Sequence, residues 1–381
     1  MRAEVGILNL WGMTGATLTV DTAVIARNTR LFASLMRGEV MAVVKADGYG
    51  AGAELVARAA LAAGATQLGV TSIGEGLTLR EAGITAPVLS WLNSVEADFG
   101  AALHHRIEVA VPSLRHLQAV AAFARSAGVR AAIHLQVDCG LAREGCPPAA
   151  WPELVAAAAA AEAEGVVQVV GLMGHLSSAD NPADPVNQRE IGCYAEALHR
   201  LWTVGLYPAH RHLAATAAAL TLPSARHSLC RVGAGLVGID PTGTGALQGA
   251  LALTAPIIDI REVAAGTPVG YGHTWVTQRP TRLAHIAIGY ADGISRALDA
   301  AASVSLNGQR LRIVGRVSMD QVVVDLGPTK ATLGEQVVVF GPGHSGEPTV
   351  DDWASWCGTI ANEIVTGIGP RVRRTAVGGA Q

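Results

Sequence analysis

The sequence predicts an α/β protein, a (β/α)8 TIM barrel followed by a mainly β C-terminal domain. Short runs of β-forming residues alternate with alanine-rich helical stretches between residues 21 and 240. After residue 245 the helical stretches give way to strand-like runs joined by short turns. Half of the 381 residues are apolar and only 15% are charged, which is typical of a compact chain long enough for two domains.

The apolar start of the chain, residues 1–20, is expected to form a strand segment that packs on the C-terminal domain. A signal peptide has a basic beginning and an uninterrupted apolar run, but here Glu4 offsets Arg2, and Gly6 and Gly12 interrupt the run. Residues 21–35 have apolar side chains at helical spacing and predict an extra helix before the first barrel strand.

Eight strand-then-helix units follow, and they place the barrel at residues 21–245. The predicted strands are 40–46, 67–72, 88–92, 107–111, 132–138, 166–175, 209–215 and 231–239. The stretches between them carry apolar residues at three- and four-residue spacing and end in glycines, as helices do. Eight such units fit a (β/α)8 barrel, with a doubly wound open sheet as the alternative.

Residues 246–381 form the predicted mainly β domain. Apolar and polar residues alternate in most of its runs, and Asn307-Gly308 predicts a tight hairpin between two strands. Only residues 351–368 have the composition of a helix.

Composition excludes several classes of function. The net charge is −3 without a basic stripe, so we expect no nucleic-acid partner. No apolar run is long enough for a membrane helix. The five cysteines lack metal-ligand spacing, so we expect no metal, reduced thiols and a cytoplasmic location.

One lysine stands out at the end of the first barrel strand. Only two of the 28 basic side chains are lysines, Lys45 and Lys330, and the rest are arginines. A solvated strand-end lysine is the simple interpretation. The alternative is chemical, because lysine is the basic side chain that can lose its proton near neutral pH and attack a carbonyl.

Further polar residues fall at the carboxyl ends of predicted strands, where barrel enzymes carry their sites. They are Tyr49, Asp138, Arg143, His175, His212, Thr216 and Arg231. Gly233 and Gly235 leave backbone N–H groups near the last two loops, a usual phosphate pocket of barrels. His175 and His212 could instead be core histidines, and Thr216 a helix cap. An amine and a phosphate cradle on one rim predict bound pyridoxal phosphate.

Several segments resemble the alanine racemase family, in family order and over nearly the whole chain. They include "AVVKADGYGAGA", "VDCGLAREG", "GLMGHLSSAD", "CRVGAGLVGID", "PVGYGHTW", "IAIGYADG" and "VSMDQ". The lysine motif occurs in other fold-type III pyridoxal-phosphate proteins, whereas "GYGHTW" and "SMDQ" are more specific to amino-acid racemases. The resemblance implies a pyridoxal 5'-phosphate enzyme that interconverts L- and D-alanine for peptidoglycan synthesis, as a homodimer with shared active sites.

By motif match, the resemblance also implies roles for individual residues. Lys45 and Tyr271 would be the two catalytic bases, Tyr271 coming from the partner subunit and bonded to His175. The implied cofactor-binding residues are Lys45, Tyr49, His175, His212, Thr216, Arg231, Gly233, Ala234 and Asn362. The implied substrate-binding residues are Arg143, Met319, Tyr290 and Asp320.

These residue types suit racemisation. The α-proton leaves one face of a planar intermediate and another is added to the opposite face, so a base is needed on each. A permanently charged Arg231 at the pyridine nitrogen, supported by His212, would disfavour protonation of the ring. That weakens the electron sink and suppresses transamination or decarboxylation, as a racemase requires.

Two positions depart from the family pattern. Gln136 stands where many members have a lysine, and it is expected to orient Arg143 by a hydrogen bond. Asn362 stands where the family commonly has a tyrosine, which raises serine or broad amino-acid racemisation as the alternative to alanine. A fold-type III decarboxylase and a non-enzymatic pyridoxal-phosphate carrier are weaker alternatives, because the "GYGHTW" segment and the second domain argue against them.

Overall fold

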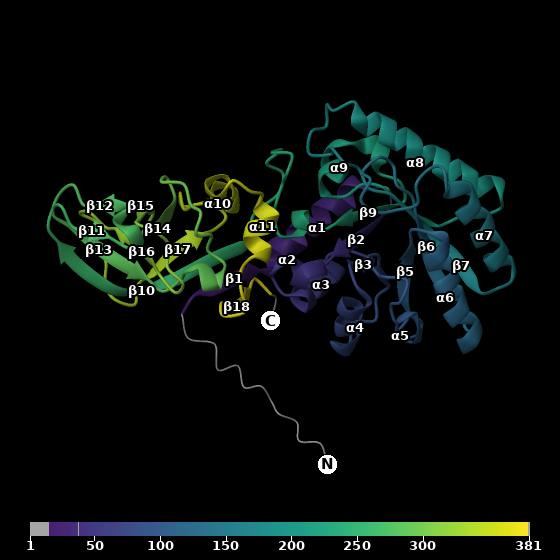
Figure 1. Ribbon diagram of the computed structural model, residues 1–381, viewed down its shortest axis with the longest axis horizontal. Coiled ribbons are helices and arrows are strands. Elements are labelled where there is room, and N and C mark those ends of the chain that lie inside the picture. The colour runs from purple at the N-terminus through teal and green to yellow at the C-terminus, as the bar shows by residue number, and fades with distance from the viewer. Residues whose placement is uncertain (1–14, 37, 380–381) are drawn as a thin grey trace, which may run out of the picture. The chain divides into compact units, whose positions relative to one another are not determined.

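A computed structural model describes residues 15–36 and 38–379 (Figure 1). The described chain divides into two compact units, one of residues 25–247 and the other of residues up to 24 together with 248 onward. The predicted strand segment at residues 1–20 lies largely outside the described residues.

Eight parallel strands form the sheet of the first unit. They are β2 (Glu39–Val43), β3 (Gln67–Val70), β4 (Val88–Ser90), β5 (Ile107–Val111), β6 (Ala131–Gln136), β7 (Val167–Met173), β8 (His210–His212) and β9 (Leu229–Val232). Neighbours follow chain order from β2 to β8, and β2 also pairs with β9. The backbone N–H of Arg231 donates to Ala214 at 3.0 Å where β8 meets β9. The sheet is therefore a nearly closed barrel, and the doubly wound alternative is wrong.

Helices follow most of the barrel strands and lie outside them (Figure 1). They are α1 (Thr22–Leu35), α2 (Lys45–Tyr49), α3 (Ala53–Ala62), α4 (Ile73–Glu81), α5 (Phe99–His104), α6 (Leu114–Ala127), α7 (Trp151–Ala163), α8 (Val186–Thr203) and α9 (Thr216–Thr221), with short 3-10 turns η1 (Pro223–Ala225) and η2 (Ala234–Leu236). Ser113 caps the start of α6 and Gly128, at φ 65°, its end. The predicted strand at 231–239 ends at Val232, because η2 begins two residues later.

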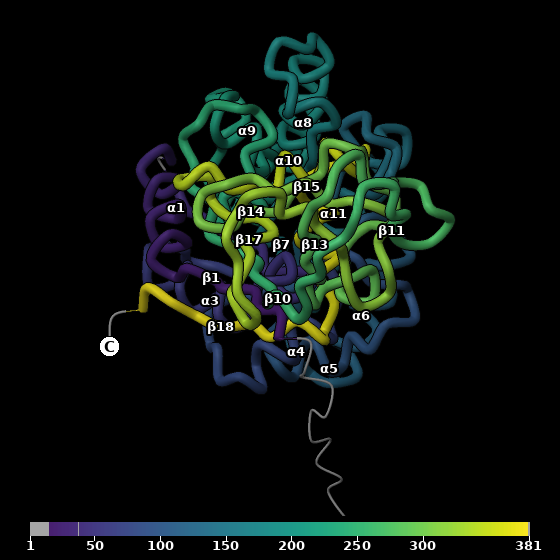
Figure 2. Tube along the Cα trace, turned by 90° about the vertical axis from the view of Figure 1, so that its left-hand side faces the viewer, coloured from purple at the N-terminus to yellow at the C-terminus, as the bar shows by residue number. Residues whose placement is uncertain are grey.

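The second unit is mainly β. Its strands are β1 (Thr17–Asp21), β10 (Leu251–Val263), β11 (Pro268–Val269), β12 (Trp275–Val276), β13 (Thr281–Ile286), β14 (Ser303–Leu306), β15 (Gln309–Val314), β16 (Val322–Asp325), β17 (Gln336–Phe340) and β18 (Arg373–Val377). Figure 2 shows β1 beside β18, and the pairing places β1 between β10 and β18. Residues from both ends of the chain thus share one sheet.

The predicted hairpin at Asn307-Gly308 is confirmed, since both residues have positive φ between β14 and β15. The predicted helix at 351–368 is two helices, α10 (Val350–Cys357) and α11 (Ala361–Thr366). Gly358 ends α10 with φ 65°, which a continuous helix does not allow. Short 3-10 turns η3 (Tyr271–His273) and η4 (Tyr290–Asp292) complete this unit. Within the described residues, no helix is both long and apolar enough to cross a membrane.

Candidate active site

A left-handed turn follows the first barrel strand and begins at Lys45. Ala46, Asp47 and Tyr49 have φ of 51°, 52° and 59°, and Gly48 between them has 64°. Non-glycine residues avoid this region, so three of them in one turn require support from the surrounding structure. The turn directs the chain from the strand end onto the rim of the barrel.

Glu75 on α4 supplies that support, and the sequence analysis missed it. Its carboxylate accepts the backbone N–H of Ala46 and of Thr71, both at 2.8 Å, and the Thr71 hydroxyl at 2.7 Å. Burial would raise the pKa of Glu75, but these hydrogen bonds lower it overall. The Ser72-x-x-Glu75 capping box was readable in the sequence, whereas the reach of Glu75 to Ala46 was not.

Lys45 is placed in an environment that favours its neutral amine. Burial lowers the pKa of the Lys45 amine below its ordinary value of 10.5. The positive charge of Arg143 lowers it further, while the charges of Glu144 and Glu75 oppose that effect. A lysine with a lowered pKa is a better nucleophile and base near neutral pH.

Hydroxyl and backbone N–H groups converge near the ends of β8 and β9. The Tyr49 hydroxyl accepts the N–H of Ala234, and the Thr216 hydroxyl accepts the N–H of Gly235 at 3.2 Å. A Cβ on Gly233 would lie 2.6 Å from Cε2 of Tyr49, so only glycine allows this approach. Burial raises the pKa of Tyr49 to about 12, which keeps its hydroxyl a donor. Thr216 begins α9 rather than capping it, because Ala215 is the cap residue.

Arg231 lies buried between two histidines. Its Nη1 is 3.0 Å from Nδ1 of His212, and its Nη2 is 3.0 Å from Nδ1 of His175. It also donates to the carbonyl oxygens of His212 and Gly174, at 2.6 and 2.7 Å. Burial and the adjacent charge of Arg231 lower the pKa of His175 to about 3. His212 is likewise neutral, since burial above all lowers its pKa well below the usual value.

Arg143 projects from the loop after β6. Asp138 Oδ1 holds that loop by accepting the N–H groups of Gly140 and Ala142. The expected hydrogen bond from Gln136 to Arg143 is wrong: Arg143 Nη2 donates to Glu144 at 2.7 Å, and the buried Gln136 Oε1 has no partner. Gln136 belongs to the barrel interior, whereas Arg143 reaches solvent from the loop.

In the second unit, three predicted residues lie on neighbouring turns. The N–H of Tyr290 donates to Ser318 at 3.0 Å and that of Ala291 to Met319 at 2.9 Å, which joins the two turns. The turn of Tyr271 contacts the same segment, since a Cβ on Gly272 would lie 3.4 Å from Nη1 of Arg316. Tyr271, Tyr290 and Met319 are exposed by 66, 41 and 52%, an unusual degree for such large side chains.

An arginine that sequence reasoning missed braces these turns. Arg371 Nη1 contacts Asp320 at 2.8 Å, and its Nε contacts the buried Asp292 at 3.2 Å. Asn362, the second residue of α11, has a buried Oδ1 without a partner. The expected roles of Tyr271 and Asn362 at the barrel site stay predictions.

The chain matches known proteins along nearly its whole length. Residues 20–241 match the family model "Alanine racemase, N-terminal domain", and residues 250–376 match "Alanine racemase, C-terminal domain". The chain belongs to the alanine racemase family. A relative named alanine racemase, from Mycobacterium avium, is 42% identical over 366 residues and covers 94% of each chain. The resemblance and the racemase class predicted from the sequence are thereby confirmed.

Solved alanine racemases share the fold. The enzyme from a D-cycloserine-producing Streptomyces lavendulae has a TM-score of 0.93 at 40% identity, covering 96% of this chain and 97% of its own. The alanine racemase from Bartonella henselae, at 26% identity and a TM-score of 0.87, covers 95% and 99% and carries covalently bound pyridoxal phosphate. All three of these relatives are alanine racemases, so nothing favours the serine or decarboxylase alternatives.

The alanine racemase family depends on pyridoxal phosphate, and the residues of this barrel fit that group. A phosphate needs several hydrogen-bond donors, and Tyr49, Thr216 and the backbone at Gly233 to Gly235 converge where a side chain on residue 233 would not fit. An aldehyde needs an unprotonated amine, and Lys45 has a lowered pKa. Among the described residues there is no cluster of His, Cys, Asp or Glu suited to a metal ion.

Proposed function

We propose that the protein interconverts L- and D-alanine with pyridoxal 5'-phosphate bound to Lys45. The single observation that carries the proposal is the placement of Lys45. A strained turn holds its partly desolvated amine beside the phosphate cradle, which is formed by Tyr49, Thr216 and the backbone at 233–235. Membership of the alanine racemase family supports alanine as the substrate.

The cofactor site is assigned to residues of the barrel. When bound, pyridoxal phosphate supplies an aldehyde carbon for an amine and a conjugated ring that withdraws electrons from the substrate Cα. The hydroxyls of Tyr49 and Thr216 and the backbone at Gly233 and Ala234 would hold its phosphate. Arg231 would face the ring nitrogen, where a guanidinium that is always charged disfavours protonation of that nitrogen.

Two bases would serve opposite faces of the substrate Cα, Lys45 on one and Tyr271 on the other. A free tyrosine is a poor base near neutral pH and needs help. Arg231 donates to Nδ1 of His175, so the neutral His175 ring carries its proton on Nε2 and can donate it to a phenolate. The positive charge of Arg143 also favours that anion, and this arginine would meet the substrate carboxylate.

Tyr271 would reach the site from a partner subunit, in a homodimer with shared active sites. The exposed Tyr271, Tyr290 and Met319 support this assembly, because monomeric proteins seldom leave such a group of large side chains open to water. Tyr290 and Asp320 would then line the entrance, and the Met319 backbone would meet the substrate carboxylate together with Arg143. We also infer a cytoplasmic location, with D-alanine passing to peptidoglycan synthesis; the five free cysteines suit a reducing compartment.

Chiral chromatography of alanine incubated with the protein and pyridoxal phosphate tests the activity, with serine as the comparison substrate. We expect racemisation of alanine, loss of activity in Lys45→Ala, and unchanged activity in Lys330→Ala, which alters the chain's other lysine. Tyr271→Phe should lose most activity while the exposed Tyr207→Phe retains it. An active Lys45→Ala protein, or no turnover of alanine by the native chain, would overturn the proposal.

Mixed dimers test the shared site. Lys45→Ala and Tyr271→Phe are each expected to be nearly inactive, whereas a mixture refolded together should recover activity, because one site of each mixed dimer receives both native residues. A mixture that stays as inactive as its components would show that each chain completes its own site.

A further inference from the structure

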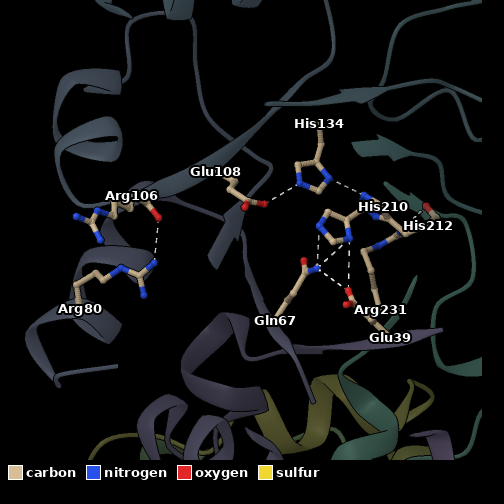
Figure 3. A network of polar contacts seen from close by, with 9 residues as sticks. All are labelled: Glu39, Gln67, Arg80, Arg106, Glu108, His134, His210, His212 and Arg231. Atoms are coloured by element: carbon tan, nitrogen blue, oxygen red, sulfur yellow. Dashed lines mark hydrogen bonds and ion pairs between the residues drawn. The ribbon is translucent and has the colours of Figure 1, made fainter. Parts of the chain in front are cut away.

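A line of four buried polar side chains crosses the barrel interior away from the proposed cofactor (Figure 3). Arg231 Nη1 lies 3.0 Å from Nδ1 of His212, and Nε2 of His212 lies 2.8 Å from Nδ1 of His134. The line of side chains ends at Glu108, whose Oε2 lies 2.8 Å from Nε2 of His134. The four residues come from β9, β8, β6 and β5.

This line replaces the apolar side chains that usually fill a barrel. His134 and His212 are fully buried, Arg231 is 3% exposed, and the Glu108 side chain is 19% exposed. The backbone makes room for it, since a Cβ on Gly171 would lie 2.6 Å from Cγ of His134. Burying such groups is costly unless every one is hydrogen-bonded, so their complete pairing calls for a functional explanation.

The partners determine where each proton lies. A guanidinium donates and never accepts, so Nδ1 of His212 must accept and its proton must sit on Nε2. The Nε2–H of His212 needs an acceptor, and its neighbour is Nδ1 of His134. Nδ1 of His134 is therefore unprotonated, and the His134 proton sits on Nε2. The Glu108 carboxylate accepts it. Both histidines are therefore neutral Nε2–H tautomers, and the hydrogen bonds run in one direction from Arg231 to Glu108.

The Glu108 carboxylate forms the far end of this line of side chains, and its surroundings set its charge state. Burial raises the pKa of the Glu108 carboxyl, but the hydrogen bond from His134 and the positive charge of Arg80 are among the causes that lower it overall. The ring of His210 stacks on His134 at a centroid distance of 5.9 Å. Its hydrogen bond is to Gln67, so His210 is not part of the line. Among the described residues, Glu108 is the carboxylate member of the four-residue line, hydrogen-bonded to His134.

We propose that Glu108 and His134 are positioning residues for the reaction: by fixing the Nε2–H tautomer of His212, they hold the Arg231 guanidinium in place. The consequence for catalysis rests on the proposed function, in which Arg231 faces the cofactor ring. A loosened Arg231 would protect the ring nitrogen less well, so the enzyme would lose both rate and fidelity. The tautomers themselves follow from geometry alone.

Nitrogen NMR of cofactor-free protein carrying 15N-histidine tests the predicted tautomers of His134 and His212 and needs no measurement of enzyme activity. We expect His134 and His212, assigned with single variants, to show protonated Nε2 and bare Nδ1 at pH 7. A protonated Nδ1 on either ring overturns the proposal whether or not the protein is a racemase.

Kinetics test the link to the site. His134→Leu should lower kcat about tenfold, the scale of one hydrogen bond to a charged group, with little change in KM. It should also form more pyruvate, the product of transamination, per racemisation. His134→Gln can donate to Glu108 and accept from His212, so it should recover most of the rate. His210→Gln is the matched control, because His210 is not part of the line, and it should behave as the native enzyme.

The outcomes separate two failures. A native protein without racemase activity refutes the proposed function and leaves the NMR result to decide the tautomers. An active native enzyme in which His134→Leu and His134→Gln both match it in kcat and pyruvate formation refutes the positioning role. If His134→Leu fails to fold, His134→Gln and the NMR of the native protein still decide.

Discussion

The Gly233 backbone lies against the Tyr49 ring so closely that a Cβ on residue 233 would come within 2.6 Å of Tyr49 Cε2. The next N–H, that of Ala234, bonds the Tyr49 hydroxyl. A glycine at the end of β9 and the turn after β2 thus form one surface. Any side chain at position 233 must displace Tyr49 from the cradle.

Gly233→Ala is therefore expected to weaken cofactor binding while the barrel still folds. We predict a fall in pyridoxal phosphate affinity of about tenfold or more, the scale of one lost hydrogen bond to an ion. Equilibrium dialysis of the cofactor measures it. Gly192→Ala on α8 is the matched control, because a Cβ there meets nothing within 4 Å. Equal affinity in the two variants would contradict the cradle.

Arg143 is predicted to tune Lys45 although it is exposed. Its positive charge helps to lower the pKa of the Lys45 amine, so Arg143→Gln should raise that pKa. The pH dependence of amine acetylation in the cofactor-free protein, read by mass spectrometry, measures the midpoint. Acetylation of Lys330 in the same sample shows how much reagent reached the protein. Arg58→Gln, which removes a different arginine, is the matched control and should leave the Lys45 midpoint unchanged. A midpoint that does not move would remove Arg143 from the environment of Lys45.

Glu75 is expected to stabilise the left-handed turn through its ionised form. Glu75→Gln should lower the free energy of unfolding by about 1–2 kcal/mol at pH 7, because the amide has one acceptor oxygen for several N–H groups. The folded-state pKa is lowered, so this stabilisation is present above the ordinary glutamate range and disappears as pH falls through the folded value. Urea unfolding at pH 7 and at pH 3.5 measures the difference.

Glu81→Gln on the same helix is the control for Glu75, since Glu81 is exposed. A Glu75→Gln deficit that persists undiminished at acid pH would mean that shape, rather than charge, matters at this position.

The sequence was sufficient for the barrel because its strands and helices are local patterns. Lys45 could be found because it ends a strand in a chain that hardly uses lysine. The left-handed turn after it could not be predicted, since the positive φ of Ala46 and Asp47 depends on Glu75, from a later helix, which accepts the backbone N–H of Ala46.

The line from Arg231 to Glu108 was invisible for another reason. Its members sit on four strands far apart in sequence, and His134 meets His212 across β7, which lies between β6 and β8 in the sheet. Gln136 shows the converse error. Its place in the family pattern suggested a hydrogen bond to Arg143, but strand alternation puts Gln136 in the interior while the loop carries Arg143 outward.

Arg371 joins the turns of Tyr290 and Met319 through Asp292 and Asp320. The Asp292 carboxylate is fully buried, and burial raises its pKa even though Arg371 opposes the shift. Arg371→Met should lower the free energy of unfolding by about 2 kcal/mol at pH 7, because it leaves a buried charge without its partner. Urea unfolding measures the loss.

The pH dependence distinguishes charge from packing. Without Arg371 the pKa of Asp292 rises further, so protonation at acid pH relieves the unpaired charge and the deficit of the variant shrinks as pH falls. Arg373→Met, an exposed arginine on the adjacent strand β18, should show neither effect. If the Arg371→Met deficit were the same at pH 5 and pH 7, the arginine would act through its apolar stem. In that case the two turns would depend on packing, and Asp292→Asn should leave the stability nearly unchanged.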